Sequence, residues 1–511
     1  MNGVKLEDLL KKVREANDVD LVEIISSSTP DAVDVQVERV EYDSRMISSQ
    51  VGRTGRENGA IFACVRGEHT DGHRFAENAV RDGAVALICD HRLPLDVPQI
   101  VVRDVRASMS AVAAILAGRP ALGMTMIGLT GTNGKTTTAY LLRSIMRAAG
   151  HKCGMLGTIV YDDGEREEYA DRTTPEGPDI QQFLARMAEN GATCCVMEAS
   201  SHGLDQGRLK GCLFDCVGFS NLTPEHLEYH RDMESYFAAK HRLFTEYVKP
   251  AWCGAANAED AYGHRLLEEF PDRLRPFSLQ NAKILESGLG GMQVEIAFSD
   301  GETITVHSPL IGDYNVSNIL ESVTIAEAIG VSREAIRAGV AGASQVPGRL
   351  ERYSLRNGVT AFIDFAHSSD GMEKVMATIR PLTKGRLIVV WGAGGDRSKE
   401  KRPAVGAKMA EYADLAVVTS DNPRSERPED IAKDVEAGVL AYGGRSEHRT
   451  ILDRGEAIYY ALDAANANDV VLIAGKGPER TIEYADREVP FSDSGTLLAW
   501  AGDRSVEVLG R

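Results

Sequence analysis

The chain has 511 residues, a hydrophobic fraction of 43%, a charged fraction of 26% and a formal net charge of −18. Its length exceeds what one hydrophobic core supports and predicts about three domains. The acidic balance argues against a nucleic-acid or anionic-membrane partner, and the chain has no uncharged apolar run of about eighteen residues that would predict a membrane span.

The first 117 residues combine short β-prone runs with helical stretches. The opening segment, MNGVKLEDLLKKVREAND, alternates charge and leucine like an amphipathic helix and lacks the apolar centre of a secretory signal, so we expect a cytoplasmic protein. The β-prone runs are 60–65, 85–89 and 99–102, and the polar, glycine-rich stretch 48–59 is expected to form an exposed loop.

The eight cysteines are too sparse for a disulfide scaffold and form no pair with metal-binding spacing. We expect them to be reduced and mostly buried. Cys194 and Cys195 fall in a predicted buried strand, and Cys212 and Cys216 are expected to flank an apolar turn.

Residues 126–146, MIGLTGTNGKTTTAYLLRSIM, show the order of strand, glycine-rich loop and helix that is typical of a phosphate-binding site. Gly131 and Gly134 would let successive N–H groups converge on an anion at the helix N-terminus. Lys135 would supply charge to the outer phosphates, and the following threonines a hydroxyl for Mg²⁺. The strict pattern has glycine where this chain has Leu129. A helix N-terminus without a ligand is the alternative, but the position between strand and helix favours ATP or GTP.

Breaks at 118–120 and 344–353 predict domains 1–119, 120–345 and 346–511, three α/β domains in series. The last domain contains three near-continuous apolar runs, RLIVVWGAGG, DLAVVTSDNP and DVVLIAGKG, each followed by a loop and a helical segment. Uninterrupted runs of this kind are typical of parallel strands that are covered by helices on both faces.

Polar residues follow several of these strands, where open parallel sheets bind their ligands. Glu198 follows CCVM and could hold Mg²⁺, although a solvated strand-end glutamate is the alternative. The cluster EHLEYH, 225–230, is a possible second metal site or an ordinary acidic helix N-terminus. Lys240 lies in a mostly apolar helical stretch, 233–244, where a lysine usually extends its amine to solvent.

Two arginines follow successive strands of the C-terminal domain. GAGGDR, 392–397, does not complete a dinucleotide-binding pattern. Arg397 and Arg424 would suit a carboxylate, which guanidinium binds through two hydrogen bonds, and a pair of surface arginines is the alternative.

Together these motifs resemble the Mur ligases, most of all the members that add the third residue of the peptidoglycan peptide. The resemblance covers nearly the whole chain and is carried, in order, by YDSR, GEHTDGHRFAENAVRDGA, TGTNGKTTT, MEASSHGL, SNLTPEHLEYH, YFAAKHRLF, GDYNVSN, VPGRLE, GAGGDRSKEKRP, SDNPR and AGKGPE. It implies a uridine-nucleotide (UDP-MurNAc) domain, a phosphate-loop ATPase domain and a Rossmann-like amino-acid-binding domain.

The activity that the resemblance implies is ATP-dependent amide-bond formation. ATP would phosphorylate the free carboxylate of UDP-MurNAc-L-Ala-D-Glu, and the amine of meso-diaminopimelate would attack the acyl phosphate, releasing ADP and phosphate. This reaction belongs to cell-wall precursor synthesis and so to cell shape and division. Two Mg²⁺ ions are implied as cofactors, the partners are small-molecule substrates, and we expect a monomer.

The site residues that the resemblance implies fall into four groups. The catalytic residues are Lys135, His226 and Lys240, and the metal ligands are Thr136, Glu198, His226 and a carbamylated Lys240. ATP would contact Gly131, Thr132, Asn133, Gly134, Lys135, Thr136, Thr137, Asn315 and Arg349. Uridine would contact Ser44 and Arg45, and the dipeptide Thr173, Thr174, Ser200, Gln206 and Arg208. The diamino acid would contact Arg397, Asp421, Asn422, Pro423, Arg424, Gly475 and Glu479.

The chain departs from the family pattern at a few positions: Glu225 and Glu228 replace aspartate, Ser369 replaces proline, Pro478 replaces histidine, and QVGRTGR is inserted before Glu57. The alternatives to the implied reaction are the same ligase with L-lysine as its amine, another three-domain amide ligase such as a folylpolyglutamate synthetase, or a non-catalytic nucleotide-dependent scaffold. The joint presence of Lys135, Glu198, His226 and Lys240 argues against the scaffold.

Overall fold

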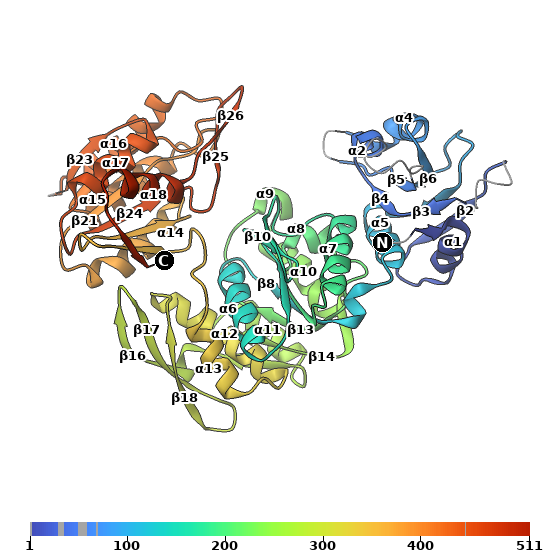
Figure 1. Cartoon of the computed structure of the whole chain (residues 1–511), viewed down its shortest axis with the longest axis horizontal. Helices are drawn as coiled ribbons and strands as arrows, with labels where there is room; N and C mark the ends of the chain where they lie inside the picture. The colour runs from blue at the N-terminus through green and yellow to red at the C-terminus, as the bar shows by residue number, and fades with distance from the viewer. Residues whose placement is uncertain (1–2, 29–34, 50–58, 68–69, 445, 511) are drawn as a thin grey trace. The chain divides into compact units, whose positions relative to one another are not determined.

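The computed structural model describes residues 3–28, 35–49, 59–67, 70–444 and 446–510 (Figure 1). The chain forms two units: Met1–Ser278 with Asn318–Gly339, and Leu279–Ser317 with Val340–Arg511. Most of the stretch 48–59, predicted to be an exposed loop, lies outside the described residues. Across the described ranges, no helix has the length and apolarity needed to cross a bilayer.

The N-terminal part of the first unit is a five-stranded sheet in the order β2-β7-β6-β5-β4, in which only the edge strand β2 is antiparallel. Helices on one face share a core with the sheet, and two further helices cover the other face. Leu9 and Val13 of the first helix are fully buried, so the predicted amphipathic helix is confirmed. The elements are β1 (Val4–Lys5), α1 (Leu6–Glu15), β2 (Leu21–Ile25), β3 (Gln36–Val37), β4 (Arg39–Glu41), α2 (Ser44–Ser49), β5 (Ala60–Ala63), η2 (Gly72–Phe75), α4 (Ala76–Arg81), β6 (Ala84–Cys89), β7 (Gln99–Val102) and α5 (Val105–Leu116).

The rest of the first unit is built on an eight-stranded sheet in the order β11-β10-β9-β12-β8-β13-β14-β15, parallel from β9 to β15. The helices α7, α8, α10 and α11 share one buried cluster with residues of this sheet such as Met126 and Val217. Its elements are η3 (Pro120–Gly123), β8 (Thr125–Thr130), α6 (Lys135–Ala148), β9 (Cys153–Leu156), β10 (Val160–Asp162), β11 (Glu167–Tyr169), α7 (Gly177–Glu189), β12 (Cys194–Glu198), α8 (Ser201–Asp205), β13 (Phe214–Phe219), α9 (Leu227–His230), α10 (Met233–Thr245), β14 (Val248–Asn257), α11 (Ala261–Glu269) and β15 (Leu274–Phe277).

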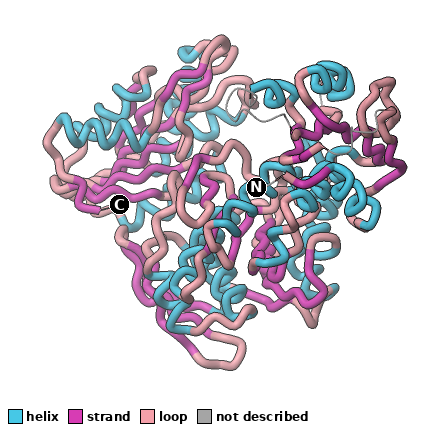
Figure 2. Tube along the Cα trace, turned by 45° about the vertical axis from the view of Figure 1, so that its right-hand side comes forward, coloured by secondary structure: helices cyan, strands magenta, loops and turns pink. Residues whose placement is uncertain are grey.

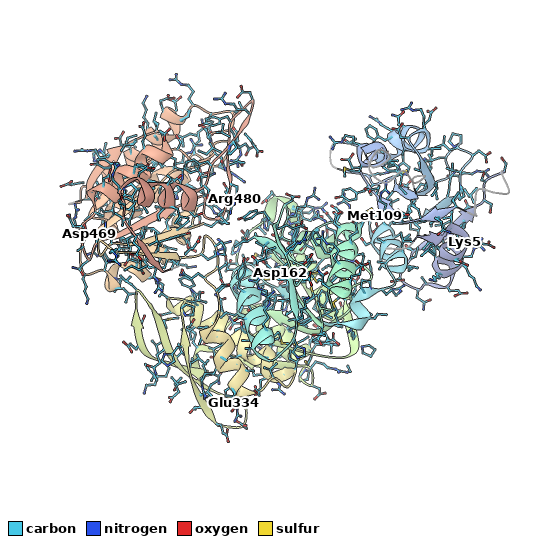
Figure 3. The ribbon with its side chains drawn as sticks, in the orientation of Figure 1. Lys5, Met109, Asp162, Glu334, Asp469 and Arg480 are labelled. Atoms are coloured by element: carbon cyan, nitrogen blue, oxygen red, sulfur yellow. The ribbon has the colours of Figure 1, made fainter. Side chains whose placement is uncertain are left out.

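A buried ionic cluster fastens α6 to this sheet. Asp162, labelled in Figure 3, accepts hydrogen bonds from Arg143 (2.7 Å) and Arg147 (2.6 Å) of α6. Arg143 and Asp162 are both buried, so each charge needs the other. The helix that follows the phosphate loop is therefore held by charge as well as by packing.

The second unit contains a seven-stranded sheet in the order β23-β22-β21-β24-β20-β19-β27, parallel from β23 to β20. One buried cluster joins it to α14, α15 and α16, and another joins it to α17 and α18. The elements are β19 (Glu351–Leu355), β20 (Thr360–Asp364), α14 (Ser369–Ile379), η5 (Arg380–Leu382), β21 (Leu387–Trp391), α15 (Lys401–Tyr412), β22 (Leu415–Val418), α16 (Pro428–Tyr442), β23 (Glu447–Thr450), α17 (Arg454–Ala464), β24 (Val470–Ala474), β25 (Thr481–Glu483), β26 (Glu488–Pro490), α18 (Asp493–Asp503) and β27 (Val508–Gly510).

The three predicted apolar runs are the fully buried strands β21, β22 and β24, and Figure 2 shows strands in magenta with helices in cyan around them. The α/β fold class and its parallel sheets are thus confirmed. The segment between the two sheets contributes η4 (Leu279–Asn281), an antiparallel sheet of β16 (Ala282–Gly288), β17 (Gly291–Ala297) and β18 (Thr303–Ser308), and the helices α12 (Asp313–Ala328) and α13 (Arg333–Ala341).

The cysteines are all free thiols, with Cys253 half-buried and the others buried, as expected. One detail of the prediction is wrong: Cys216 lies inside β13, where it pairs with Cys253 of the neighbouring strand, and not beside a turn. The apolar run FDCVGF continues as strand through this cysteine because each of its residues packs in the sheet.

Candidate active site

The loop between β8 and α6 has the backbone that the glycine pattern predicts. Gly131 and Gly134 adopt φ values of +141° and +94°, which side chains rarely tolerate. A Cβ at Gly131 would lie 2.0 Å from Ser220 Oγ, and one at Gly134 would lie 2.4 Å from Asn318 Oδ1. Only glycine fits either position, so the loop can pass close to these side chains.

The segment after β13 holds this loop in shape. Thr132 N donates to Asn221 O (2.8 Å), Asn133 N donates to Asn221 Oδ1 (3.0 Å), and Ser220 Oγ donates to Asn133 O (2.6 Å). Lys135 Nζ donates to the carbonyls of Gly131 and Thr132, both at 2.9 Å. The lysine charge therefore lies within the loop whose N–H groups would meet a phosphate.

Glu198, at the end of β12, is buried beside the same loop. Its carboxylate accepts hydrogen bonds from Thr136 Oγ1 (3.0 Å), Thr158 Oγ1 (3.0 Å) and Thr158 N (2.9 Å). It is 1% exposed, so the alternative of a solvated strand-end glutamate is wrong. Thr136 and Glu198 together offer the oxygen ligands that Mg²⁺ prefers.

Lys240 is buried in α10 and points at the phosphate loop. Its side chain is 2% exposed, its Nζ donates to Gly131 O at 2.8 Å, and the same atom lies 4.6 Å from the centre of the Tyr236 ring. Burial, reinforced by the nearby charge of Lys135, holds the pKa of this amine well below its ordinary value. The alternative of a lysine that extends to solvent is therefore wrong.

His226 is only partly covered. It adopts a left-handed backbone (φ +56°), and its ring lies 5.0 Å from that of His202 and 6.4 Å from that of Tyr236. The flanking carboxylates of Glu225 and Glu228 approach it at 4.0 and 3.7 Å. The ring of Tyr236 lies between this histidine and Lys240, whose amine sits over the face of that ring.

His230, in the same stretch, is a packing residue. Its Nε2 lies 2.9 Å from Ser201 Oγ, and its ring packs at a tilt against that of Tyr236, with centroids 5.0 Å apart. Burial, with help from the charge of His202, lowers the pKa of His230 to about 4. The predicted metal cluster 225–230 thus separates into an accessible His226 and a buried, neutral His230.

The five residues predicted to bind the dipeptide lie in one hydrogen-bonded network beside Glu198. Thr174 Oγ1 donates to Glu198 O (2.8 Å) and accepts from Ser200 N (3.0 Å). Arg208 donates to Thr174 O (2.9 Å) and to Gln206 Oε1 (2.6 Å). Thr173 joins the network separately, through Thr158 (3.1 Å between hydroxyl oxygens).

Three further members of this network, Arg106, Arg172 and Glu176, were not predicted from the sequence. Arg106, Arg172 and Arg208 converge on the buried Glu176, with N–O separations of 2.8, 2.9 and 3.3 Å. The stretch DRTTPEG places Glu176 two residues after the predicted threonines, which was the available signal. Arg106 comes from a distant helix, α5, and no local pattern could have indicated it.

Ser44 and Arg45, predicted to contact uridine, begin α2. Arg45 is exposed, and its guanidinium pairs with Asp43 at 2.6 Å. A cavity of about 500 Å³ lies beside them, and Tyr42, Asp43, Met46 and Asp179 line part of it.

In the second unit, most of the predicted amino-acid-binding residues gather at the ends of β22 and β24. Asn422 Nδ2 donates to Glu479 Oε2 (2.9 Å), and Gly475 adopts φ +109° where a Cβ would lie 2.9 Å from Asp421 Oδ2. Burial raises the pKa of Asp421. The carbonyl of Pro423 packs directly against Gly395.

The two arginines of this region differ in their surroundings. Arg424 adopts a left-handed backbone and donates from Nε to Glu483 (2.8 Å) and from Nη1 to Gly395 O (2.8 Å). Arg397 is exposed on the loop after β21. Glu483 is therefore an additional residue of this region that the motifs did not indicate.

Lys476 is a second residue of this region that was not predicted from the sequence. It is fully buried, and its Nζ donates to Asn422 Oδ1 (2.9 Å) and Glu479 Oε2 (2.7 Å). It therefore holds two of the predicted amino-acid-binding residues together. The motif AGKGPE contains it, but a lysine in a glycine-rich turn is usually solvent-exposed.

Asn315 and Arg349, predicted to approach the nucleotide, also lie in the second unit. Asn315 is buried and donates to Ile311 O at 2.7 Å. The guanidinium of Arg349 lies 4.8 Å over the ring of Phe365.

Comparison with known proteins matches three family models along the chain in order: Mur ligase family, catalytic domain (24–120), Mur ligase middle domain (129–326) and Mur ligase, glutamate ligase domain (348–477). A UDP-N-acetylmuramoyl-L-alanyl-D-glutamate–2,6-diaminopimelate ligase of Geobacter sulfurreducens is 40% identical over 485 residues, 89% of this chain and 93% of that protein.

Two solved structures extend the comparison. One of a UDP-N-acetylmuramoyl-L-alanyl-D-glutamate–2,6-diaminopimelate ligase is 28% identical, with a TM-score of 0.66 over 98% of this chain and 99% of that one. A folylpolyglutamate synthase of Mycobacterium tuberculosis shares the fold, at 19% identity and a TM-score of 0.59 over 72% of this chain and 92% of that one. With a phosphate loop built as the motifs predict and 40% identity across 89% of its length to a named member, the chain belongs to the Mur ligase family.

Proposed function

We propose that this protein is an ADP-forming ligase that joins meso-diaminopimelate to UDP-MurNAc-L-Ala-D-Glu in peptidoglycan precursor synthesis in the cytoplasm. Relatives that are 40% identical carry the name of that ligase. The observation that carries the proposal is the convergence of Lys135, Glu198 and Lys240 on one phosphate loop, with the network around Thr174 directly beside Glu198.

In the reaction, the carboxylate of the D-glutamyl residue attacks the γ-phosphorus of ATP, and the bond from that phosphorus to the bridging oxygen of ADP breaks. The amine then attacks the resulting acyl phosphate, loses a proton and displaces phosphate. Both reactants of the first step are anions, so Lys135 and the N–H groups of the loop lower the barrier by offsetting their repulsion.

The donor set fits Mg²⁺. Thr136 and Glu198 would hold one ion, and His226 with a carbamylated Lys240 the other. Bound there, Mg²⁺ supplies positive charge to the phosphate and carboxylate oxygens that approach each other. Thr158 orients the carboxylate of Glu198 through its hydroxyl and its N–H.

Carbamylation of Lys240 joins the neutral amine to CO₂, which gives a carbamate and releases a proton. Desolvation favours it, because it lowers the pKa of the amine and so raises the fraction of neutral amine that can react with CO₂. The product is a carboxylate on a long arm and hence an oxygen ligand. Tyr236 and the loop carbonyl of Gly131 fix where that arm lies.

For the diamino acid we assign the group around Asp421, Asn422, Arg424 and Glu479. A carboxylate beside the distal amine separates diaminopimelate from lysine, and Arg424 is the cation able to pair with it. Asn422 and Glu479 offer acceptors for an amine, and Lys476 holds them in place.

The test is release of ADP in the presence of ATP, UDP-MurNAc-L-Ala-D-Glu and a panel of amino acids. We expect ADP release to require both the dipeptide substrate and diaminopimelate. Lys135→Ala should lower turnover by about a hundredfold or more, since it removes charge stabilisation at the transferred phosphate.

Lys374→Ala is a suitable control, because that exposed lysine pairs only with Asp370 on α14 among the contacts of the described chain. Near-normal turnover of Lys135→Ala, or ADP release that ignores the dipeptide, would contradict the proposal.

A further inference from the structure

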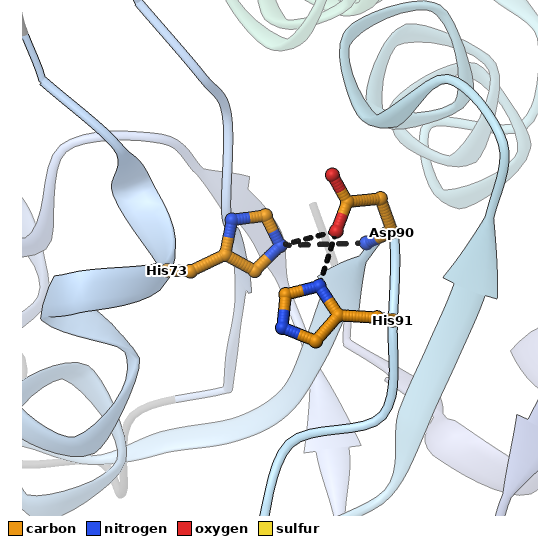
Figure 4. Close-up of side chains that lie close together, drawn as sticks. All are labelled: His73, Asp90 and His91. Atoms are coloured by element: carbon orange, nitrogen blue, oxygen red, sulfur yellow. Dashed lines mark hydrogen bonds and ion pairs between the residues drawn. The ribbon is translucent and has the colours of Figure 1, made fainter.

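A cluster of two histidines and an aspartate lies in the N-terminal part of the chain, among residues to which the ligase reaction assigns no role. His73 belongs to η2, and Asp90 and His91 follow directly after β6 (Figure 4). One ligand atom from each of the three lies within 4.8 Å of the others. Two segments separated in sequence thus present two imidazole nitrogens and a carboxylate oxygen to one point.

The two rings meet the same oxygen. His73 Nε2 lies 3.1 Å from Asp90 Oδ1, and His91 Nδ1 contacts that oxygen as well. The rings are nearly parallel, with centroids 4.8 Å apart. Figure 4 shows both nitrogens directed at the carboxylate.

The tautomer of His73 follows from its other contacts. Its Nδ1 lies 2.7 Å from Asp71 Oδ1, which can only accept, so Nδ1 carries the hydrogen. Its Nε2 receives the N–H of Asp90 at 3.4 Å, so in the neutral ring Nε2 carries a lone pair. That lone pair faces the lone pairs of Asp90 Oδ1, a repulsive arrangement that a cation between the two atoms would reverse.

We propose that His73, Asp90 and His91 bind a borderline divalent cation of the zinc class, with water as a fourth ligand. Two imidazole nitrogens and one carboxylate oxygen suit Zn²⁺, whereas Mg²⁺ prefers oxygen ligands. Asp71 supplies the outer carboxylate that typically orients a metal-binding histidine. The ion would link η2 to the end of β6.

Charge and burial support the site. Arg66 pairs with Asp90 through Oδ2 at 2.9 Å, which leaves Oδ1 directed at the histidines. The carboxylates of Asp71 and Asp90 outnumber the one guanidinium, that of Arg66, around the two histidine rings, and this excess of negative charge favours a dication. The side chain of His73 is 7% exposed, whereas that of His91 is 55% exposed, so an ion can enter from the His91 side.

The test is equilibrium dialysis of the full chain against Zn²⁺ in excess Mg²⁺, with bound zinc measured by elemental analysis. We expect one zinc ion per chain that depends on this cluster. Asp71→Asn should weaken its binding about 10–100-fold, as loss of an outer carboxylate typically does, and His91→Ala should weaken it further. His91→Ala should remain folded, because that side chain is exposed.

His264→Ala is the matched control, because His264 is an exposed histidine whose one carboxylate neighbour among the described residues is Glu268, at 3.5 Å. It should bind zinc like the wild type. Co²⁺ bound to the wild type should give the visible spectrum of a tetrahedral site, and that spectrum should be lost in His91→Ala. Zinc binding that is undetectable, or equal in wild type and His91→Ala, would overturn the inference and leave a proton-sharing hydrogen-bond cluster.

Discussion

Lys240 shows what burial adds to a sequence pattern. A lysine on a mostly apolar helix face is compatible with an amine that extends to solvent and equally with an amine enclosed by protein. The structure encloses it between Gly131 and Tyr236. The lowered pKa of its amine follows from that enclosure, because loss of water disfavours the charged form of the amine.

We predict that Lys240 takes up CO₂ near neutral pH. Protein equilibrated with ¹³C-labelled bicarbonate should give a carbamate resonance in its ¹³C NMR spectrum. Lys240→Arg should lack that resonance, because arginine stays protonated, and should lose ligase turnover. Lys210→Arg, on a partly exposed lysine, should keep both. An unchanged resonance in Lys240→Arg would show that the carbamate forms elsewhere.

Glu321 is a second residue whose behaviour depends on burial. It lies in α12, is 1% exposed and accepts a hydrogen bond from Thr138 Oγ1 of α6 at 3.0 Å. Burial raises the pKa of this carboxyl from 4.5 to about 8. Folded protein therefore holds a proton here that the unfolded chain has released.

This difference predicts how stability changes with pH. Between pH 4.5 and 8 the folded state binds more protons at Glu321, so its contribution to the free energy of unfolding falls as pH rises through that window. Glu321→Gln should remove a fall on the order of 4 kcal/mol. Urea unfolding of both proteins at the two ends of the window measures it, with Glu334→Gln on the exposed side of α13 as control. Equal pH dependence in wild type and Glu321→Gln would refute the protonated state.

At the scale of elements, α6 lies between two left-handed glycines with different surroundings. Gly131, before the helix, has Ser220 Oγ 2.0 Å from where a Cβ would be, whereas Gly150, after it, has φ +89° and open space. Alanine at either position meets unfavourable backbone energy of about 1–2 kcal/mol. Only at Gly131 must the neighbouring segment also move.

We therefore predict that Gly131→Ala raises the Kd for ATP by about tenfold or more, in line with a loss above 1.4 kcal/mol. Gly150→Ala should lower the melting temperature slightly and leave the Kd unchanged. Isothermal titration of both variants with ATP separates the two effects. Equal ATP affinity in the two variants would mean that the loop tolerates a side chain.

The elements themselves could largely be predicted. The run 99–102 is β7, and the helical stretch 233–244 is α10 with one more residue, because apolar periodicity reflects the faces that pack. Cys216 was misplaced because the cysteine spacing suggested a turn within an apolar run. Lys476 and Arg106 were not identified because their role depends on neighbours distant in sequence, which no local pattern contains.

At the scale of the whole molecule, the choice of amine distinguishes two ligases with the same chemistry. We predict that meso-diaminopimelate is used and lysine is a poor substrate, because Arg424 can pair with the distal carboxylate of diaminopimelate, which lysine lacks. Loss of one partner of a desolvated carboxylate typically costs about 2–5 kcal/mol, or roughly thirty- to several-thousandfold. Arg424→Ala should lower kcat/KM for diaminopimelate within that range and leave the KM for ATP near normal.

Arg427→Ala is the control, since that arginine is exposed, lies immediately before α16 and pairs with Glu429 at 3.5 Å. Glu483 pairs with Arg424 Nε and would therefore compete with the distal carboxylate of the substrate for that guanidinium. Glu483→Gln should accordingly lower the KM for diaminopimelate. Equal use of lysine and diaminopimelate by the wild type would refute the specificity while leaving the ligase assignment intact.

The division into domains 1–119, 120–345 and 346–511 stays a prediction. The residue patterns indicate breaks at 118–120 and 344–353, whereas packing groups the first two segments into one unit and assigns 279–317 to the other. Composition can indicate where glycine- and proline-containing breaks interrupt the apolar segments of a chain. It cannot indicate that residues 318–339 pack with a sheet whose last strand ends at Phe277.

The packing of residues 318–339 with the first unit affects the order in which the protein can fold during synthesis. The nucleotide-binding unit is interrupted: its last part, Asn318–Gly339, follows a stretch that belongs to the other unit. On the ribosome, where chains emerge from the N-terminus, the phosphate loop is synthesised long before Asn318, which closes over Gly134, and Glu321, which accepts the hydrogen bond from Thr138. A nascent chain that ends at 278 has every strand of the ATPase sheet and lacks both of these supports. The native ATP site can therefore form only after about the first two-thirds of the chain has been synthesised.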